Sequence, residues 1–181
     1  MANLLRTVPL IDVDFVRGEG CYLFDSQGRP YLDLESGSWS AILGHGHRAP
    51  MAALREQAGR LVHLSPRHSC ALAKEAADAF VSLLGWETGS CTFLNSGSEA
   101  VEFALQAARR ASGRPLLLRL EGSYLAAYGT AGDTADPAWL TLRWRGRGDE
   151  ELERDIAALP WERIGAFVFE PGGASRAGRP G

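Results

Sequence analysis

Lysine and cysteine are both scarce in this 181-residue sequence. Lys74 is the only lysine, so any chemistry that requires a lysine amine depends on that one position. The cysteines, Cys21, Cys70 and Cys91, are odd in number and far apart, and none forms a C-x-x-C pair. This spacing argues against a zinc site or a disulfide framework and predicts a reduced, cytoplasmic chain.

The sequence also lacks long apolar runs and an excess of positive charge. No stretch approaches the roughly 20 apolar residues of a membrane span, and the start of the chain carries acids where a signal peptide needs an apolar run. A net charge of −3 and a pI near 5.8 argue against a general binder of nucleic acid or anionic membranes. The densest basic run, residues 143–147, is therefore interpreted as a solvated loop.

The pattern that organises the chain lies in residues 91–110, which read CTFLNSGSEAVEFALQAARR. The apolar run 91–94 has the length of a strand, and the polar turn after it leads into apolar residues at helical spacing. Ser96 and Glu99 match a capping box, which predicts that the helix begins at Ser96 and ends near Gly113. A strand, a glycine turn and an open helix N-terminus are typical of a phosphate site, although an ordinary capped turn has the same pattern.

Strand-like and helix-like segments alternate along the rest of the chain. We expect a β-hairpin over residues 21–34, helices over 50–61, 69–84 and 149–159, the last capped by Asp149, and strands over 115–120, 140–144 and 164–169. This order is typical of an α/β domain with a largely parallel sheet, in which ligands bind beyond the carboxyl ends of the strands. Residues 95–98, residues 121–124 and Glu170 each follow a predicted strand, so we expect them to converge.

Residues 37–47 are too rich in glycine for a regular element, and we expect a loop there. His45 and His47 could suggest a metal. Two ligands this close together, with no third candidate nearby, make a poor site, so no metal is predicted.

Four separated stretches resemble class III aminotransferases, fold-type I enzymes that depend on pyridoxal 5′-phosphate (PLP). They are GEGCYLFDSQGRPYLDLESG from Gly18, SGSWSAILGHGHRAP from Ser36, NSGSEA from Asn95 and FEP from Phe169. The resemblance implies an α/β fold with an N-terminal β-hairpin and substrate-side loop over residues 1–48. Residues 49–181 would form the first part of the PLP-binding large domain, a mostly parallel sheet, with its C-terminal part absent. Within the family, Ser38 and Trp39 are similar to the diaminopelargonate type.

The same resemblance assigns roles to five residues. The backbone of Gly97 and Ser98 would bind the cofactor phosphate, assisted by the Ser98 hydroxyl. Tyr124 matches the aromatic residue that lies on the pyridine ring, and Glu170 matches the glutamate near the oxygen-bearing edge of the cofactor. Trp39 matches an aromatic of the substrate pocket, although ordinary core packing would also account for a tryptophan at this position.

The chain departs from the family most in what it lacks. PLP chemistry needs a lysine that forms a Schiff base with the cofactor and an aspartate at the pyridine nitrogen. In the family both residues lie after the Glu-Pro pair, whereas Lys74 precedes the phosphate turn. We therefore expect no catalytic residue within this chain. Leu125 also stands where the family usually has histidine, and residues 172–176 replace a Gln and a second Glu.

Three hypotheses follow. In the first, the chain is half of a split or truncated aminotransferase that moves an amino group between a small amine or amino acid and a keto compound. A second chain would supply the lysine, the aspartate and the C-terminal part in a hetero-oligomer or a dimer-based assembly. In the second, the chain is a non-catalytic relic or assembly partner. The third, an α/β hydrolase, rests on residues 173–177, where alanine replaces the last glycine of the nucleophile-elbow pattern.

Overall fold

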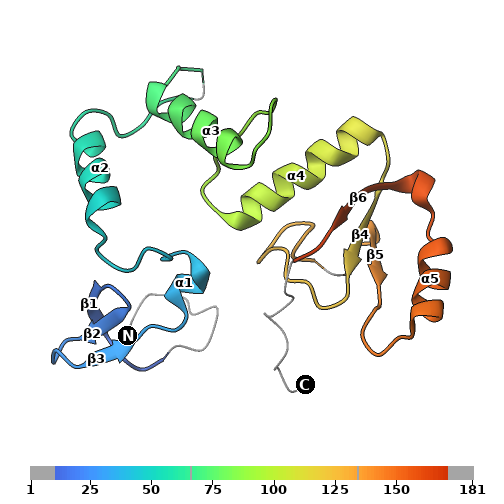
Figure 1. Ribbon diagram of the computed structural model, residues 1–181, viewed down its shortest axis with the longest axis horizontal. Coiled ribbons are helices and arrows are strands. Elements are labelled where there is room, and N and C mark those ends of the chain that lie inside the picture. The colour runs from blue at the N-terminus through green and yellow to red at the C-terminus, as the bar shows by residue number, and fades with distance from the viewer. Residues whose placement is uncertain (1–10, 66, 134, 171–181) are drawn as a thin grey trace. The chain divides into compact units, whose positions relative to one another are not determined.

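The computed structural model describes residues 11–65, 67–133 and 135–170, and the chain divides into two compact units, Met1–Ala71 and Leu72–Gly181. The elements of the first unit are β1 (Phe15–Glu19), β2 (Tyr22–Asp25), β3 (Pro30–Leu32), α1 (Ser36–Trp39) and α2 (Arg48–Ala58) (Figure 1). From the boundary onward they are α3 (Ala71–Leu83), α4 (Gly97–Ser112), β4 (Leu116–Leu120), β5 (Trp139–Leu142), α5 (Asp149–Ala157), a 3₁₀ turn (Trp161–Arg163) and β6 (Ile164–Val168). The predicted boundary at residue 48, between the hairpin with its substrate-side loop and the PLP-binding large domain, stays a prediction. No helix in the described ranges has both the length and the apolar character needed to cross a membrane.

The first unit contains the predicted β-hairpin, extended by one strand. β2 pairs antiparallel with both β3 and β1. The carboxylate of Asp25 organises the turn, because it accepts hydrogen bonds from the backbone N–H groups of Gln27 and Arg29, each at 2.9 Å, and from the Arg29 side chain at 2.7 Å. Asp25 is only 4% exposed, and this burial by itself raises its pKa. The hydrogen bonds from Arg29, Gln27 and Tyr31 outweigh the burial and lower the pKa of Asp25 to about 2.

The loop that carries Trp39 is closed at both ends by one side chain, Asp33. Its Oδ1 atom accepts hydrogen bonds from the N–H groups of Glu35 (3.1 Å) and Ser36 (2.8 Å), and its Oδ2 atom lies 2.8 Å from Nε2 of His45. The hydrogen bond with His45 is the largest of the causes that lower the pKa of Asp33. Between these ends α1 is a single turn with left-handed dihedral angles, with φ of 53° at Ser36 and 67° at Trp39. Apart from this one turn, which the sequence did not predict, the glycine-rich segment forms an anchored loop.

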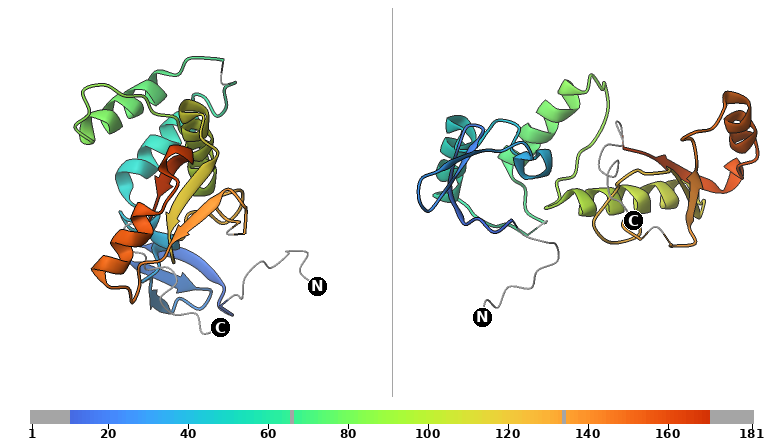
Figure 2. Two further views of the ribbon diagram at one scale, coloured as in Figure 1. Left: turned by 90° about the vertical axis from the view of Figure 1, so that its right-hand side faces the viewer. Right: turned by 90° about the horizontal axis from the view of Figure 1, so that it is seen from below.

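The second unit is built on a parallel sheet with the strand order β5-β4-β6. Adjacent residues of the central strand face opposite sides, so Leu117 packs with Leu105 of α4, whereas Leu118 packs with Leu142 and with Leu152 of α5. The two helices therefore cover opposite faces of the sheet (Figures 1 and 2). This arrangement confirms the predicted α/β fold with a parallel sheet.

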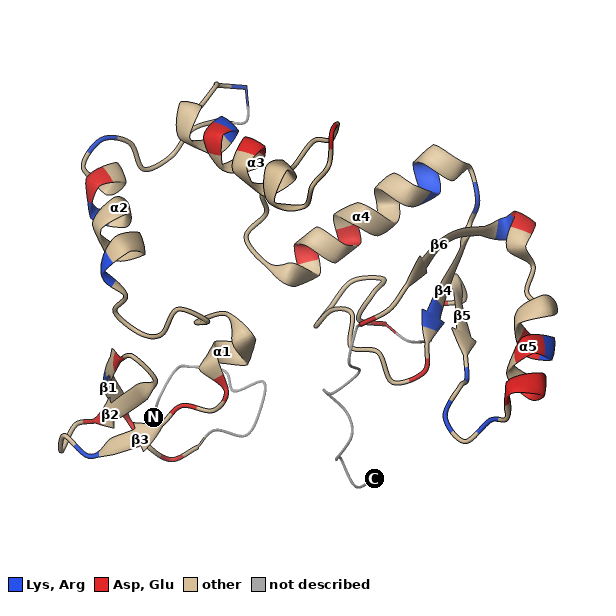
Figure 3. Ribbon diagram, in the orientation of Figure 1, with Lys and Arg blue, Asp and Glu red and all other residues tan. Residues whose placement is uncertain are grey.

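Two local predictions are wrong. Residues 91–94 form no strand, because none of the described strands pairs with them and a strand needs such a partner for its backbone hydrogen bonds. The N-cap of α5 is Gly148 rather than Asp149, and no side chain caps it. Asp149 instead begins a first turn with Glu150 and Glu151, where the helix dipole favours acidic side chains (Figure 3).

Candidate functional site

The N-terminus of α4 forms as the sequence predicts. Ser96 is the N-cap, and its hydroxyl oxygen accepts a hydrogen bond from the N–H group of Glu99 at 3.2 Å. In return the carboxylate of Glu99 accepts hydrogen bonds from the N–H groups of Ser96 (3.0 Å) and Asn95 (2.8 Å). The helix ends at Gly113, which has the left-handed φ of 67°. The capping box and the glycine stop are therefore confirmed.

The capping box leaves the next two donors open. The N–H groups of Gly97 and Ser98 lie in the first turn of α4, where the helix offers them no acceptor, and no other described residue bonds to them. A Cβ atom placed on Gly97 would meet no atom within 4 Å, so the space beside this backbone is open. Two convergent N–H groups at the positive end of a 16-residue helix can bind a phosphate.

The loop after β4 lies against this turn. The Ser98 hydroxyl oxygen accepts a hydrogen bond from the N–H group of Ala127 at 2.9 Å, and the Ser96 hydroxyl lies 3.1 Å from that of Tyr128. Because the oxygen of Ser98 serves as an acceptor to Ala127, its own hydrogen stays available for donation to a phosphate oxygen. The sequence carried no periodic signal for the contact with Tyr128, which lies in an irregular loop.

The end of β6 meets the same loop. The N–H group of Tyr124 donates a hydrogen bond to the carboxylate of Glu170 at 3.3 Å, and the Ser123 hydroxyl accepts a weak one from the N–H group of Glu170 at 3.5 Å. Tyr124 is 47% exposed and so is accessible to a ligand. The predicted approach of residues 121–124 to Glu170 is confirmed by these contacts. The contacts with the phosphate turn are made by Ala127 and Tyr128, which lie beyond the predicted residues on the same loop.

The remaining predicted residues lie elsewhere. Trp39 belongs to the first unit, where it is 62% exposed, and its place in a substrate pocket stays a prediction. Within the described ranges no three His, Cys, Asp or Glu side chains are grouped so that they could hold a metal ion. The hydrolase pattern at 173–177 lies outside the described residues.

Sequence reasoning missed the role of Glu102. Helical spacing places it on the polar face of α4, which predicts a solvated side chain. In the structure its carboxylate is half-buried and accepts hydrogen bonds from the N–H group (2.9 Å) and the hydroxyl (3.1 Å) of Thr130. No spacing rule indicates this contact, because the two residues are 28 positions apart.

Comparisons with known proteins agree with this geometry. The family described as Aminotransferase class-III matches residues 5–127. The acetylornithine aminotransferase of Archaeoglobus fulgidus is 36% identical over 122 residues, which cover 67% of this chain and 32% of that protein. Among solved structures, an S-selective transaminase from Arthrobacter sp. matches with a TM-score of 0.82 at 23% identity, over 93% of this chain and 46% of that one. A taurine:2-oxoglutarate aminotransferase from Bifidobacterium kashiwanohense, in complex with PLP and glutamate, matches with a TM-score of 0.76 at 20% identity, over 94% of this chain and 45% of that one.

The extent of these matches bears on two expectations. The chain spans about a third of the length of the Archaeoglobus relative and less than half of each solved chain. It therefore covers part of the fold-type I architecture, as predicted. The named sequence relative is an acetylornithine aminotransferase and not of the diaminopelargonate type, which corrects the predicted likeness.

Proposed function

Because the chain belongs to the class III aminotransferase family, we propose that it supplies the cofactor-phosphate half of a PLP-dependent aminotransferase. The observation that carries the proposal is the first turn of α4, which has two open N–H groups and unfilled space beside Gly97. The complete enzyme would move an amino group between a small amine or amino acid and a keto compound. The chain itself offers the means to bind and orient the cofactor.

The residues of the chain have separable tasks in this proposal. The N–H groups of Gly97 and Ser98 and the Ser98 hydroxyl hold the phosphate, where three donors and the helix dipole favour a dianion. The ring of Tyr124 would lie against the pyridine ring of PLP and hold its orientation. Glu170, which accepts a hydrogen bond from the Tyr124 N–H group, would lie near the oxygen-bearing edge of the cofactor. Bound PLP supplies an electron sink for negative charge on the substrate carbon.

The lysine and the aspartate that this chemistry needs come, in our proposal, from the part of the relatives' length that this sequence does not span. That part would be joined to the sequence or carried by a second chain, in an assembly of dimers. Lys74 lies on α3, before the phosphate turn, and is not proposed as the reacting lysine.

The test of this function uses the 181-residue chain with PLP, alone and together with a polypeptide that contains the missing aspartate and lysine. We expect the chain alone to bind PLP without covalent attachment and without transamination, and the mixture to transaminate. Borohydride reduction followed by mass spectrometry detects attachment. A reduced adduct at Lys74 that accompanies turnover by the chain alone would contradict the proposal.

One observation favours a non-catalytic alternative. Leu125, which replaces the usual histidine of the family, packs against the core cluster around Leu105 and Leu117. The side chain at this position therefore serves packing, which is what a non-catalytic relic that keeps the fold for assembly would need. This alternative predicts that the mixture binds PLP but does not transaminate.

A further inference from the structure

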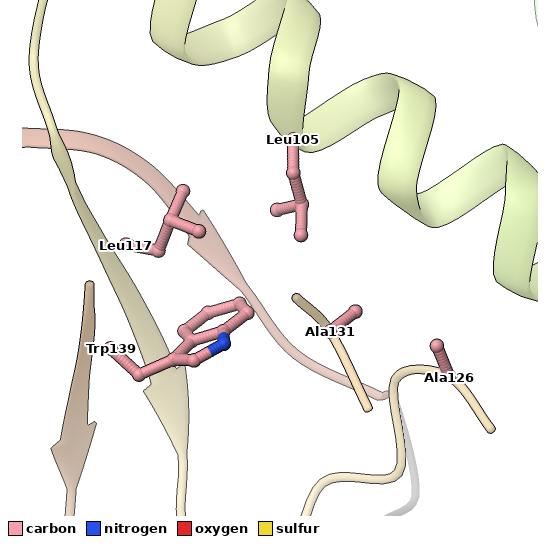
Figure 4. Close-up of a cluster of buried hydrophobic side chains, with 5 residues drawn as sticks. All are labelled: Leu105, Leu117, Ala126, Ala131 and Trp139. Carbon is pink, nitrogen blue, oxygen red and sulfur yellow. The ribbon is translucent and has the colours of Figure 1, made fainter. Parts of the chain in front are cut away.

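The long loop between β4 and β5 is held in place although its described residues form no helix or strand. Such loops are usually mobile, but here Ala126 and Ala131 are buried in the core cluster with Leu105 and Trp139 (Figure 4). The loop contributes these two alanines and the partly buried Leu125 to the cluster, which is a small apolar surface for so long a loop. The polar contacts of the loop must therefore contribute to its fixed position.

Hydrogen bonds to neighbouring elements fix the loop at Thr130. Its N–H group and its hydroxyl both donate to the carboxylate of Glu102, at 2.9 and 3.1 Å, and its carbonyl oxygen accepts a hydrogen bond from the indole N–H of Trp139 at 2.6 Å. In Figure 4 the indole nitrogen lies on the side of the ring that faces Ala131. All three hydrogen-bonding groups of Thr130 are thus satisfied, two of them by one charged acceptor.

The residue before Thr130 is fitted to the same carboxylate. Gly129 has a φ of 75°, and a Cβ atom placed on it would lie 2.8 Å from Oε2 of Glu102. Any other residue would have to push the carboxylate away as well as adopt a strained backbone. The close approach of Glu102 therefore depends on glycine at this position.

The hydrogen bonds between Glu102 and Thr130 are linked to the candidate phosphate site through α4 and through the loop. Glu102 and Ser98 are one helical turn apart on α4, and Ser98 holds Ala127, three residues before Thr130. Tyr124 lies three residues before Ala127 on the same loop. A loop released at Thr130 would lose two of the hydrogen bonds that join its described residues to the helix that carries the phosphate donors.

We propose that Glu102 is a positioning residue for the cofactor site: it holds the loop against α4 so that Tyr124 and the Ser98 hydroxyl are preset before the cofactor binds. This inference rests on the proposed function. A preset loop binds its ligand more tightly, because the conformational entropy of the loop has already been lost on folding.

The test compares Glu102→Ala, Thr130→Val and Thr130→Ser with the unmodified chain. The ligand is pyridoxine 5′-phosphate, which lacks the aldehyde and cannot attach to a lysine. Hydrogen exchange at the amides of Ala127 and Thr130 measures how firmly the loop is held against α4. Calorimetric titration gives the Kd of the ligand. Glu75→Ala, which removes an exposed glutamate from α3, is the matched control.

Loss of two hydrogen bonds to a carboxylate should accelerate exchange of the Ala127 and Thr130 amides by roughly ten- to a hundredfold, beyond any change at Leu117 in β4. We expect Kd to rise about tenfold in Glu102→Ala. The rise should be smaller in Thr130→Val, which keeps the N–H donor and the fold, and absent in Thr130→Ser and Glu75→Ala.

Two results would overturn the proposal in distinguishable ways. Faster exchange with an unchanged Kd in both Glu102→Ala and Thr130→Val would show that Glu102 serves structure alone. A failure of the unmodified chain to bind the probe would instead refute the proposed function and the positioning role together.

Discussion

Replacement of Gly97 by valine should separate the stability of the fold from its capacity to bind a phosphate. Gly97 is the first residue of α4, and its position accepts a Cβ atom without any contact within 4 Å. Valine has a better helix propensity than glycine by about 0.4 kcal/mol, so Gly97→Val should fold at least as stably as the unmodified chain.

The effect on binding should be much larger than the effect on folding. The branched side chain would occupy the open space through which a phosphate reaches the N–H groups of Gly97 and Ser98. Each hydrogen bond to a charged group contributes about 1.5–3 kcal/mol, so the loss of both would weaken binding by about 3–6 kcal/mol. This corresponds to an increase in Kd of roughly 10²- to 10⁴-fold.

Titration with pyridoxine 5′-phosphate measures Kd, and urea unfolding measures the free energy of unfolding. Gly148→Val is the control, because Gly148 also lies at a helix N-terminus, as the N-cap of α5, and also has open space at its Cβ position. It should leave Kd unchanged. An unchanged Kd in Gly97→Val would refute the reasoning and show that the turn is an ordinary helix cap.

Two further predictions concern the fold. Leu117 is fully buried, so Leu117→Ala should lower the free energy of unfolding in urea by about 2–5 kcal/mol. Leu83→Ala, at a position 82% exposed, should change it by less than about 0.5 kcal/mol, and equal effects would contradict the described core. The pKa of Asp25 is lowered from 3.8 to about 2, so its contribution to stability is complete above pH 3.8 and is lost as the pH falls toward 2. Acid titration followed by circular dichroism should show this loss in the unmodified chain and not in Asp25→Asn, and identical profiles would contradict the role of the carboxylate.

Local signals in the sequence determined the helix that carries the site. A capping box depends on residues three positions apart, and a left-handed stop requires only the glycine at the helix end, so Ser96, Glu99 and Gly113 define α4 without help from the rest of the chain. The alternation of strands and helices likewise determined a parallel sheet. The positions of Gly97 and Ser98 followed from these local rules.

Only the tertiary structure decided the outcomes that depend on distant partners. Residues 91–94 have the composition of a strand but form none, because none of the described strands lies beside them. Glu102 has the spacing of a solvated residue, yet it binds Thr130, 28 positions away, once β4 and α4 have packed. Hydrogen bonds over such distances in sequence arise from the pairing of strands and the packing of helices, which the residues at either end do not encode locally.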